Sequence, residues 1–316
     1  NKKGEFVGGP TYYMKKGFKN KKLGTVFSLI FAFALMIEII PSIMVQGHSA
    51  ASTMKDTFNV PMAVSGVILA FLAALVVFGG VKRIASFAEK IVPIMVGLYC
   101  FFGFLIILMN IGHVPNVIWL VVEQAFNPTA AVGGTFGAAL ATTIRWGFAR
   151  GIYSNEAGLG TSSIAHAAAK TDHPVRQAFW GISEIVVDTL IICSTTGFVV
   201  LVSGVWKASD AKAQSAALTA RAFENSFGQF GSMMVSISMM FFVFSTVVVV
   251  IFYGSRMAEF LFGLTAGWVM KTIYVLSMIV GALGAAQQLW DLLDLALAAV
   301  LIPNVIAVIM LSPKVK

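Results

Sequence analysis

Charged residues are scarce in this chain of 316 residues. Asp, Glu, Lys and Arg together make up only 11% of the sequence, whereas 58% of the residues are hydrophobic and the mean hydropathy is +0.86. A water-soluble domain of this size does not need so much apolar surface to build its core, so the composition excludes that class. The sequence predicts an all-α polytopic protein embedded in the lipid bilayer.

Cysteine and catalytic motifs are also scarce. The two cysteines, Cys100 and Cys193, both lie in apolar runs, and their spacing speaks against a disulfide framework or a metal site. No Ser/His/Asp order, zinc signature or nucleotide-binding loop occurs, and the Gly158-Leu-Gly160 pair follows no predicted strand. We therefore expect no enzymatic activity and no cofactor.

The net charge of +8 does not indicate a nucleic-acid partner, because the basic residues form short clusters between apolar runs rather than one basic face. Such clusters are typical of loops that orient a membrane protein. Apolar runs long enough to cross a bilayer predict eight spanning helices, at about residues 23–47, 61–81, 91–111, 136–168, 179–206, 232–262, 268–286 and 289–311.

The basic clusters fall at every second connection between these runs. Seven lysines precede the first run, and the opposite connections hold only Lys55, Lys207, Lys212 and Arg221. Cytoplasmic loops of membrane proteins carry the excess of Lys and Arg. We therefore expect Asn1 and Lys316 both to face the cytoplasm, with the protein in the cell membrane.

One stretch inside the apolar sequence is unusually polar. Residues 147–160 combine four glycines with an arginine, a serine, an asparagine and a glutamate. Each glycine weakens a helix by roughly 1 kcal/mol relative to alanine, and the short polar side chains offer competing hydrogen bonds. We expect the helix to open near residues 151–160 and to present backbone groups to a solute or ion. The alternative is a tightly packed helix in which Glu156 pairs with Arg150.

Three further carboxylates lie in apolar runs. Glu184 and Asp188 share one face of a predicted helix, where they would repel each other if both were charged. They could form a proton or cation relay, but we favour pairing with Arg145, Arg150 or interfacial water. Glu38 interrupts the first run and marks either a kink or an extra polar contact.

Several long motifs resemble one family of transporters. They are RGIYSNEAGLG at residues 150–160, IAHAAAKTDHPVRQ at 164–177, GEFVGGPTYY at 4–13, Phe244-Ser-Thr246, Tyr253-Gly254 and Ile302-Pro-Asn304. On these motifs the chain is identified as a member of the alanine or glycine:cation symporters, also called the sodium:alanine symporter family. The matches extend from residue 4 to residue 304 and so cover nearly the whole chain.

The resemblance implies a fold of the leucine-transporter type. This fold has two inverted repeats of five helices, and its first and sixth core helices are broken around the solute. The eight predicted helices would be core helices three to ten of a single transmembrane transporter domain, residues 1–316. The first core helices would lie upstream of Asn1, so we expect the chain to be truncated at its N-terminus.

The resemblance also implies which residues bind the solute. Ser154 and Asn155 would contact its amino or carboxylate group, and Gly158 would let the unwound backbone approach it. Gln46 matches a polar pocket residue of the family. Val250 stands where family members commonly carry a tryptophan, which implies room for solutes larger than glycine and alanine.

Ser245 and Thr246 form a hydroxyl pair in a long apolar run. From chemistry alone, each hydroxyl is expected to bond back to the carbonyl four residues earlier. The resemblance implies instead that the pair ligates Na⁺, a hard cation that prefers oxygen ligands.

Together these observations predict a secondary active transporter. The expected activity is sodium-coupled symport of small neutral amino acids of the alanine/glycine class by alternating access. A proton-coupled amino-acid permease or a channel of the same fold is the alternative. The expected partners are the amino acid, Na⁺ as the coupled solute and the lipid bilayer, with no nucleic acid.

Overall fold

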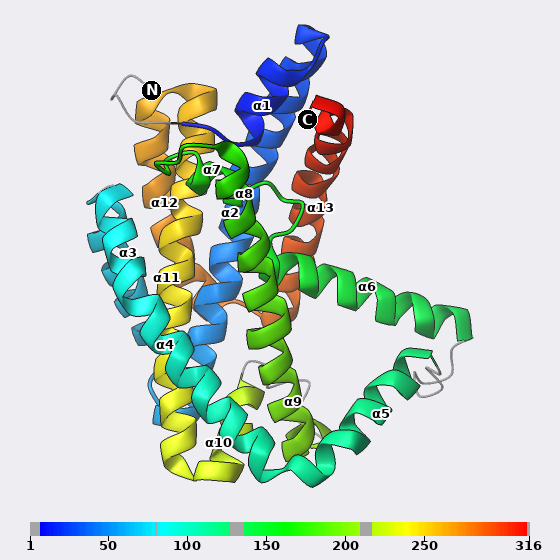
Figure 1. The fold of residues 1–316 in the computed structure, drawn as a ribbon. Helices are drawn as coiled ribbons and strands as arrows, with labels where there is room; N and C mark the ends of the chain where they lie inside the picture. Colours follow the sequence, from blue (N-terminus) through cyan, green and yellow to red (C-terminus); the bar gives the residue numbers. More distant parts are fainter. Residues whose placement is uncertain (1–6, 80, 127–135, 209–216, 315–316) are drawn as a thin grey trace.

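The computed structural model describes residues 7–79, 81–126, 136–208 and 217–314, and these parts of the chain are helical with no strand (Figure 1). The helices in chain order are α1 (Pro10–Gly17), α2 (Lys21–Phe58), α3 (Met62–Val77), α4 (Val81–Met109), α5 (Val114–Phe126), α6 (Phe136–Asn155), α7 (Ser162–His166), α8 (Pro174–Ile185), the π-helical η2 (Val186–Cys193), α9 (Ser194–Ser203), α10 (Leu218–Phe227), α11 (Gln229–Phe262), α12 (Leu264–Leu283) and α13 (Ala286–Leu311).

All eight predicted apolar runs contain helix, but they do not all span a membrane as single helices. In the described residues, six helical segments are long and apolar enough to cross a bilayer: Lys21–Phe58, Glu89–Met109, Pro174–Ser203, Gln229–Phe262, Leu264–Leu283 and Gln287–Lys314. The helix α3 has 16 residues, or about 24 Å of rise, which is less than the roughly 30 Å of a bilayer core. The run at 136–168 is interrupted between α6 and α7.

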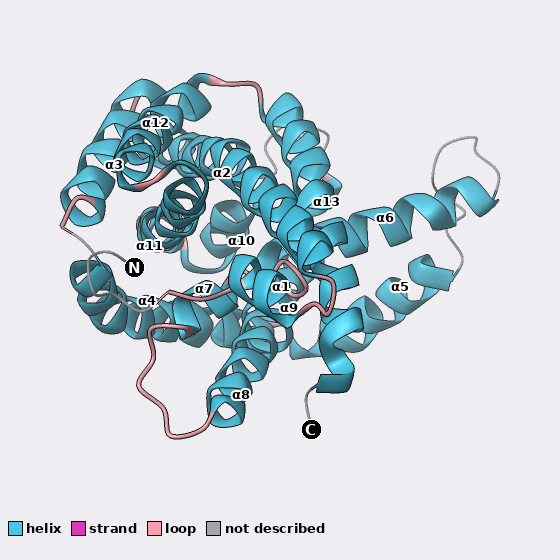
Figure 2. Cartoon of the chain, turned by 90° about the horizontal axis from the view of Figure 1, so that it is seen from above, coloured by secondary structure: helices cyan, strands magenta, loops and turns pink. Residues whose placement is uncertain are grey.

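The long helix α2 runs through the middle of the bundle and packs against α11, α12 and α13 (Figure 2). Small residues let the backbones approach: a Cβ on Gly47 would lie 2.7 Å from the carbonyl oxygen of Met278 on α12. The buried hydroxyl of Tyr274 donates to the carbonyl oxygen of Met36 at 2.7 Å. Such close contacts are typical of membrane helices, which associate through packing and hydrogen bonds rather than through the hydrophobic effect.

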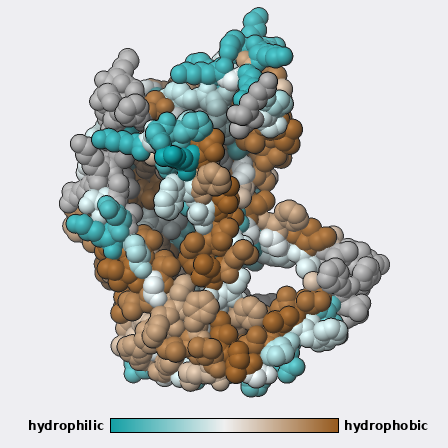
Figure 3. Space-filling model, in the orientation of Figure 1, coloured by the Kyte–Doolittle hydropathy of each residue, from teal (hydrophilic) through white to brown (hydrophobic). Residues whose placement is uncertain are grey.

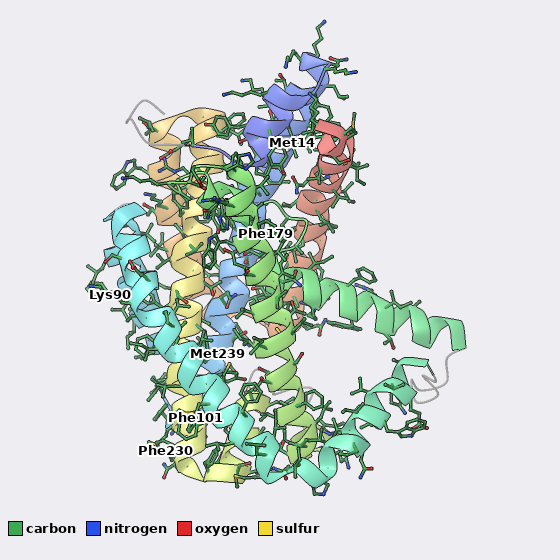
Figure 4. The ribbon with its side chains drawn as sticks, viewed as in Figure 1. Met14, Lys90, Phe101, Phe179, Phe230 and Met239 are labelled. Atoms are coloured by element: carbon green, nitrogen blue, oxygen red, sulfur yellow. The ribbon has the colours of Figure 1, made fainter. Side chains whose placement is uncertain are left out.

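The outer surface of the bundle matches a lipid environment. Large apolar side chains point outward, among them Phe101 on α4 and Phe179 on α8, which are 59% and 63% exposed (Figure 4). The end of the molecule that carries α1 and the C-terminus is hydrophilic, whereas the middle is largely hydrophobic (Figure 3). The lysine-rich start of α2 lies at that same end (Figure 1).

Two helices, α5 and α6, extend away from the bundle (Figures 1 and 2). The hydropathy pattern does not predict α5, which has only 13 residues. The C-terminal end of α6 returns to the bundle and meets η2. This end of α6 carries the polar stretch singled out by the sequence.

Candidate functional site

The polar stretch breaks the helix as predicted. The helix α6 ends at Asn155, and α7 begins at Ser162. Between them the backbone is left-handed at Glu156, Gly158 and Gly160, with φ angles of 53°, 87° and 82°. Glycine adopts this conformation without strain, but a residue with a Cβ does so rarely and at a cost. We refer to residues 156–161 as the break.

Local hydrogen bonds hold the break in one conformation. The Oδ1 atom of Asn155 accepts from the Ala157 amide at 2.9 Å, and the carbonyl oxygen of Glu156 accepts from the Leu159 amide at 3.0 Å. The hydroxyl of Thr161 donates to the carboxylate of Glu156. A side-chain oxygen of Asn that bonds its own backbone two residues later is typical of turns, and here it ends the helix.

Asn304 on α13 forms a hydrogen bond with the backbone of the break. Its Nδ2 atom donates to the carbonyl oxygen of Gly158 at 2.7 Å, and its Oδ1 atom accepts from the hydroxyl of Tyr13 on α1. Asn304 is only 1% exposed. A Cβ on Gly160 would lie 2.6 Å from Pro10 Cγ and 2.9 Å from Asn304 Nδ2. The break, α1 and α13 are therefore in direct contact.

The two polar residues predicted to hold the solute face η2. Asn155 Nδ2 donates to Thr189 Oγ1 at 3.0 Å, and Ser154 Oγ donates to Asp188 Oδ2 at 2.7 Å. Both partners belong to the π-helical η2. Wide turns of this kind are rare and occur frequently at functional sites. The structure thus brings Ser154 and Asn155 together against η2. In this structure both side chains form hydrogen bonds with protein side chains.

A small cavity of about 20 Å³ lies behind the break, which is room for about one water-sized particle. Its polar walls are side chains from α2, from α6 and the break, and from α11, namely Glu38, Ser42, Tyr153, Glu156, Thr161 and Tyr253. Val250 also lines it and is 4% exposed. The predicted solute residue Gln46 reaches this region through Tyr153, to whose hydroxyl its Nε2 atom donates at 2.9 Å.

The hydroxyl pair on α11 lies apart from these cavity walls. Ser245 is 8% exposed and donates to the carbonyl oxygen of Phe242, three residues earlier, at 2.9 Å. This is the back-bonded arrangement that chemistry alone favours, although the acceptor is one residue closer than expected. Sodium ligation by Ser245 and Thr246 stays a prediction.

Arg150 pairs with none of the carboxylates that the sequence suggested for it, which were Glu156, Glu184 and Asp188. Its Nη2 atom lies 2.6 Å from Asp294 Oδ2 of α13, and its guanidinium carbon lies 4.0 Å from the ring centroid of Trp290. The tightly packed alternative, in which Arg150 pairs with Glu156, is therefore wrong. The cation–π contact and the ion pair together tie α6 to α13.

The expected pairing of Glu184 or Asp188 with Arg150 is also wrong, because Arg150 pairs with Asp294. Glu184 instead accepts from Ser162 Oγ at 2.8 Å and lies 2.9 Å from His166 Nε2. Glu184 thus joins α8 to α7, and Asp188 joins η2 to α6, on the two sides of the break. They do so through hydroxyl and imidazole groups that the spacing of charges in the sequence could not identify.

The sequence reasoning missed two residues that shape the site. Asn304 entered it only as part of a motif, and Tyr153 only as part of the polar stretch. A usable signal for Asn304 was its position directly after Pro303 in an otherwise apolar run, because a polar amide there needs a buried partner.

The whole chain resembles a known family of transporters. The model of the sodium:alanine symporter family matches residues 1–316. The uncharacterized transporter YflA of Bacillus subtilis is 55% identical over 316 residues, which are 100% of this chain and 66% of that protein. The sodium/alanine symporter AgcS of Methanococcus maripaludis is 36% identical over 312 residues, 98% of this chain and 68% of its own length.

A relative with a different named solute is the probable sodium/glutamine symporter GlnT of Bacillus subtilis. It is 35% identical over 308 residues, which are 97% of this chain and 63% of that protein. The chain thus spans about two thirds of the length of the curated relatives it matches. Its helices carry the apolar surface of a multi-pass membrane protein. The chain belongs to the sodium:alanine symporter family, a family of transporters and not of enzymes.

Proposed function

We propose that this protein moves a small neutral amino acid together with Na⁺ across the cell membrane by alternating access. The observation that carries the proposal is the break between α6 and α7, a hydrogen-bonded interruption of helix within a bundle with a lipid-facing surface. Backbone groups freed at such depth need partners, and broken helices are how many secondary transporters hold zwitterionic solutes. The printed names of AgcS and GlnT support sodium and an amino acid as the solutes.

In this proposal the fold is of the leucine-transporter type, and the break is its sixth core helix. Ser154 and Asn155 exchange their present hydrogen bonds with η2 for bonds to the amino or carboxylate group of the solute. Gly158 admits the unwound backbone, and Gln46 completes the polar wall. This exchange costs little, because each polar group trades one partner for another. Ser245 and Thr246 serve Na⁺, and both ends of the chain face the cytoplasm.

Uptake into liposomes tests the coupling ion. The protein is reconstituted, and entry of radiolabelled alanine is followed with an inward gradient of Na⁺, of Li⁺ or of protons alone. We expect uptake to follow the Na⁺ gradient and to be small with the other two. Uptake that a proton gradient drives equally well without Na⁺ would instead support the proton-coupled permease.

The size of the accepted solute depends on Val250. This side chain is buried on α11 and lines the cavity behind the break. We expect serine, threonine, valine or glutamine to compete with labelled alanine better than glycine does. Each additional buried methylene adds about 0.8 kcal/mol, so room for two of them shifts preference more than tenfold.

The Val250→Trp variant is the matched test of this preference. The present cavity of about 20 Å³ is too small for an amino acid, so in this proposal the site beside Val250 widens when the solute binds. An indole at position 250 occupies that additional room, so the larger solutes should lose their advantage while alanine still competes. Folding of the variant is checked by its elution from a size-exclusion column. If glycine and alanine outcompete all larger solutes in the wild-type protein, Val250 does not set selectivity.

A further inference from the structure

Glu38 on α2 is a buried carboxyl group without a bonding partner among the described residues. It is 4% exposed, and within the described part of the chain no hydrogen bond or salt bridge reaches it. Its side chain lines the 20 Å³ cavity behind the break. A buried polar group is normally satisfied by a protein group, by water or by an ion, so this carboxyl group points to a ligand in the cavity.

A second carboxyl group, that of Glu156, lines the same cavity from the break. It accepts from Thr161 and occupies a left-handed backbone conformation at φ 53°. That strained position keeps its side chain at the cavity wall. Strain of this kind persists where the surroundings over-determine it, and it is concentrated at functional sites.

The arginines nearest in sequence to the cavity residues of α6 and α11 pair with other carboxylates. Arg150 pairs with Asp294, and Arg256 pairs with Glu259. Two ionised carboxylates facing one small, largely apolar cavity would repel each other and lose their hydration. A proton or a small cation held between Glu38 and Glu156 removes this repulsion.

We propose that Glu38 and Glu156 form a site for one monovalent cation, at which a proton and a dehydrated Na⁺ compete. The polar walls of the cavity offer only oxygen atoms, from carboxyl and hydroxyl groups, which is the ligand type that Na⁺ prefers. When Na⁺ enters, the O–H bond of the protonated carboxyl group breaks, the proton leaves to water, and Na⁺ takes its place. The net charge of the cavity is unchanged.

Other titratable and charged groups surround Glu38. On the elements around α2 these groups are four tyrosines, one ion pair and one carboxyl group: Tyr13 on α1, Tyr153 on α6, Tyr253 on α11, Tyr274 on α12, the Arg150–Asp294 pair between α6 and α13, and Glu156 in the break. The helix α3 carries no such group. Glu184 and Asp188 lie beyond Glu156. Among the side chains that line the cavity, only Glu38 and Glu156 carry carboxyl groups, and a carboxyl group can hold either a proton or Na⁺.

The inference deepens the proposed function, because it concerns the coupled cation, but its test needs no transport. Binding of ²²Na⁺ to the purified protein is measured without amino acid between about pH 8.5 and 5.5. Competition at one site predicts that the apparent Kd for Na⁺ rises as the pH falls, approaching about tenfold per pH unit. Addition of NaCl to weakly buffered protein should release about one proton per protein molecule.

Two variants with an uncharged side chain test whether the released proton comes from these carboxyl groups. Glu38→Gln keeps the shape of the side chain but removes the proton that is exchanged, so we expect sodium-dependent proton release to disappear. Glu156→Gln should do the same, which provides a second variant if the first folds poorly. Glu224→Gln, on the exposed face of α10, is the matched control and should behave as the wild type.

The outcomes separate this inference from the proposed function. A wild-type Kd for Na⁺ that is constant across this pH range, or proton release that survives in both variants, overturns the inference. A protein that shows the pH-dependent binding but takes up no amino acid in liposomes retains the site and contradicts the proposed symport.

Discussion

Replacement of Gly160 by alanine is expected to abolish amino-acid uptake and to lower the thermal stability of the protein. Gly160 has a φ of 82°, and an added Cβ would lie 2.6 Å from Pro10 Cγ and 2.9 Å from Asn304 Nδ2. The left-handed conformation alone costs an L-residue roughly 1–2 kcal/mol. The methyl group also has to displace Asn304, whose hydrogen bond to Gly158 closes the break.

The matched control for this variant is Gly147→Ala. Gly147 lies within α6, and a Cβ there meets no atom within 4 Å. Alanine is the better helix former by roughly 1 kcal/mol, so this change should leave uptake intact and keep or raise stability. Initial uptake rates in liposomes and the unfolding midpoint in detergent provide the comparison. Wild-type uptake by Gly160→Ala would show that the contacts of the break with α1 and α13 are not needed for transport.

Replacement of Asn155 by alanine is expected to raise the amino-acid concentration for half-maximal uptake tenfold or more. Asn155 ends α6 through its bond to the Ala157 amide and donates to Thr189 at 3.0 Å. In the proposed function it also binds the charged end of the solute. Loss of even one charge-assisted hydrogen bond, at about 1.5–3 kcal/mol, corresponds to a tenfold or larger change in affinity.

A variant of its partner distinguishes a solute contact from a role in holding η2. Thr189→Val keeps the shape of the side chain but removes the acceptor on η2. If Asn155 acts only by holding η2, both variants should lose the same affinity. If it binds the solute, Thr189→Val should stay close to the wild type. Asn225→Ala, on the exposed face of α10, controls for the loss of an amide elsewhere.

Local composition was enough to predict the long apolar helices and the break. An apolar run long enough for a bilayer specifies helix whatever its neighbours are, and four glycines beside short polar side chains weaken helix wherever they occur. The helix α5 escaped prediction because its 13 residues are too few to register as a span. The shortness of α3 was missed because hydropathy does not mark the end of a helix at Val77.

The contacts that complete the site could not be read from local composition. Arg150 and Asp294 are separated by 144 residues, and Tyr13 and Asn304 by 291. The sequence suggested Glu156 as the partner of Arg150 only because the two charges lie in the same polar stretch. Which carboxylate Arg150 meets depends on how α13 packs against α6, and that packing is a property of the whole bundle.

The π-helical η2 has a consequence for how relatives of this chain vary in length. A helix wound with i to i+5 bonds contains a surplus residue compared with an α-helix of the same rise. The segment belongs to the span Pro174–Ser203. If one residue within Val186–Cys193 is deleted, that segment can tighten to α-helix, and the two ends of the span keep their positions. The same deletion elsewhere in the span would shift every later side chain by about 100° around the axis. Among family members, gaps within this span should collect in these eight residues, which include the partners of Ser154 and Asn155.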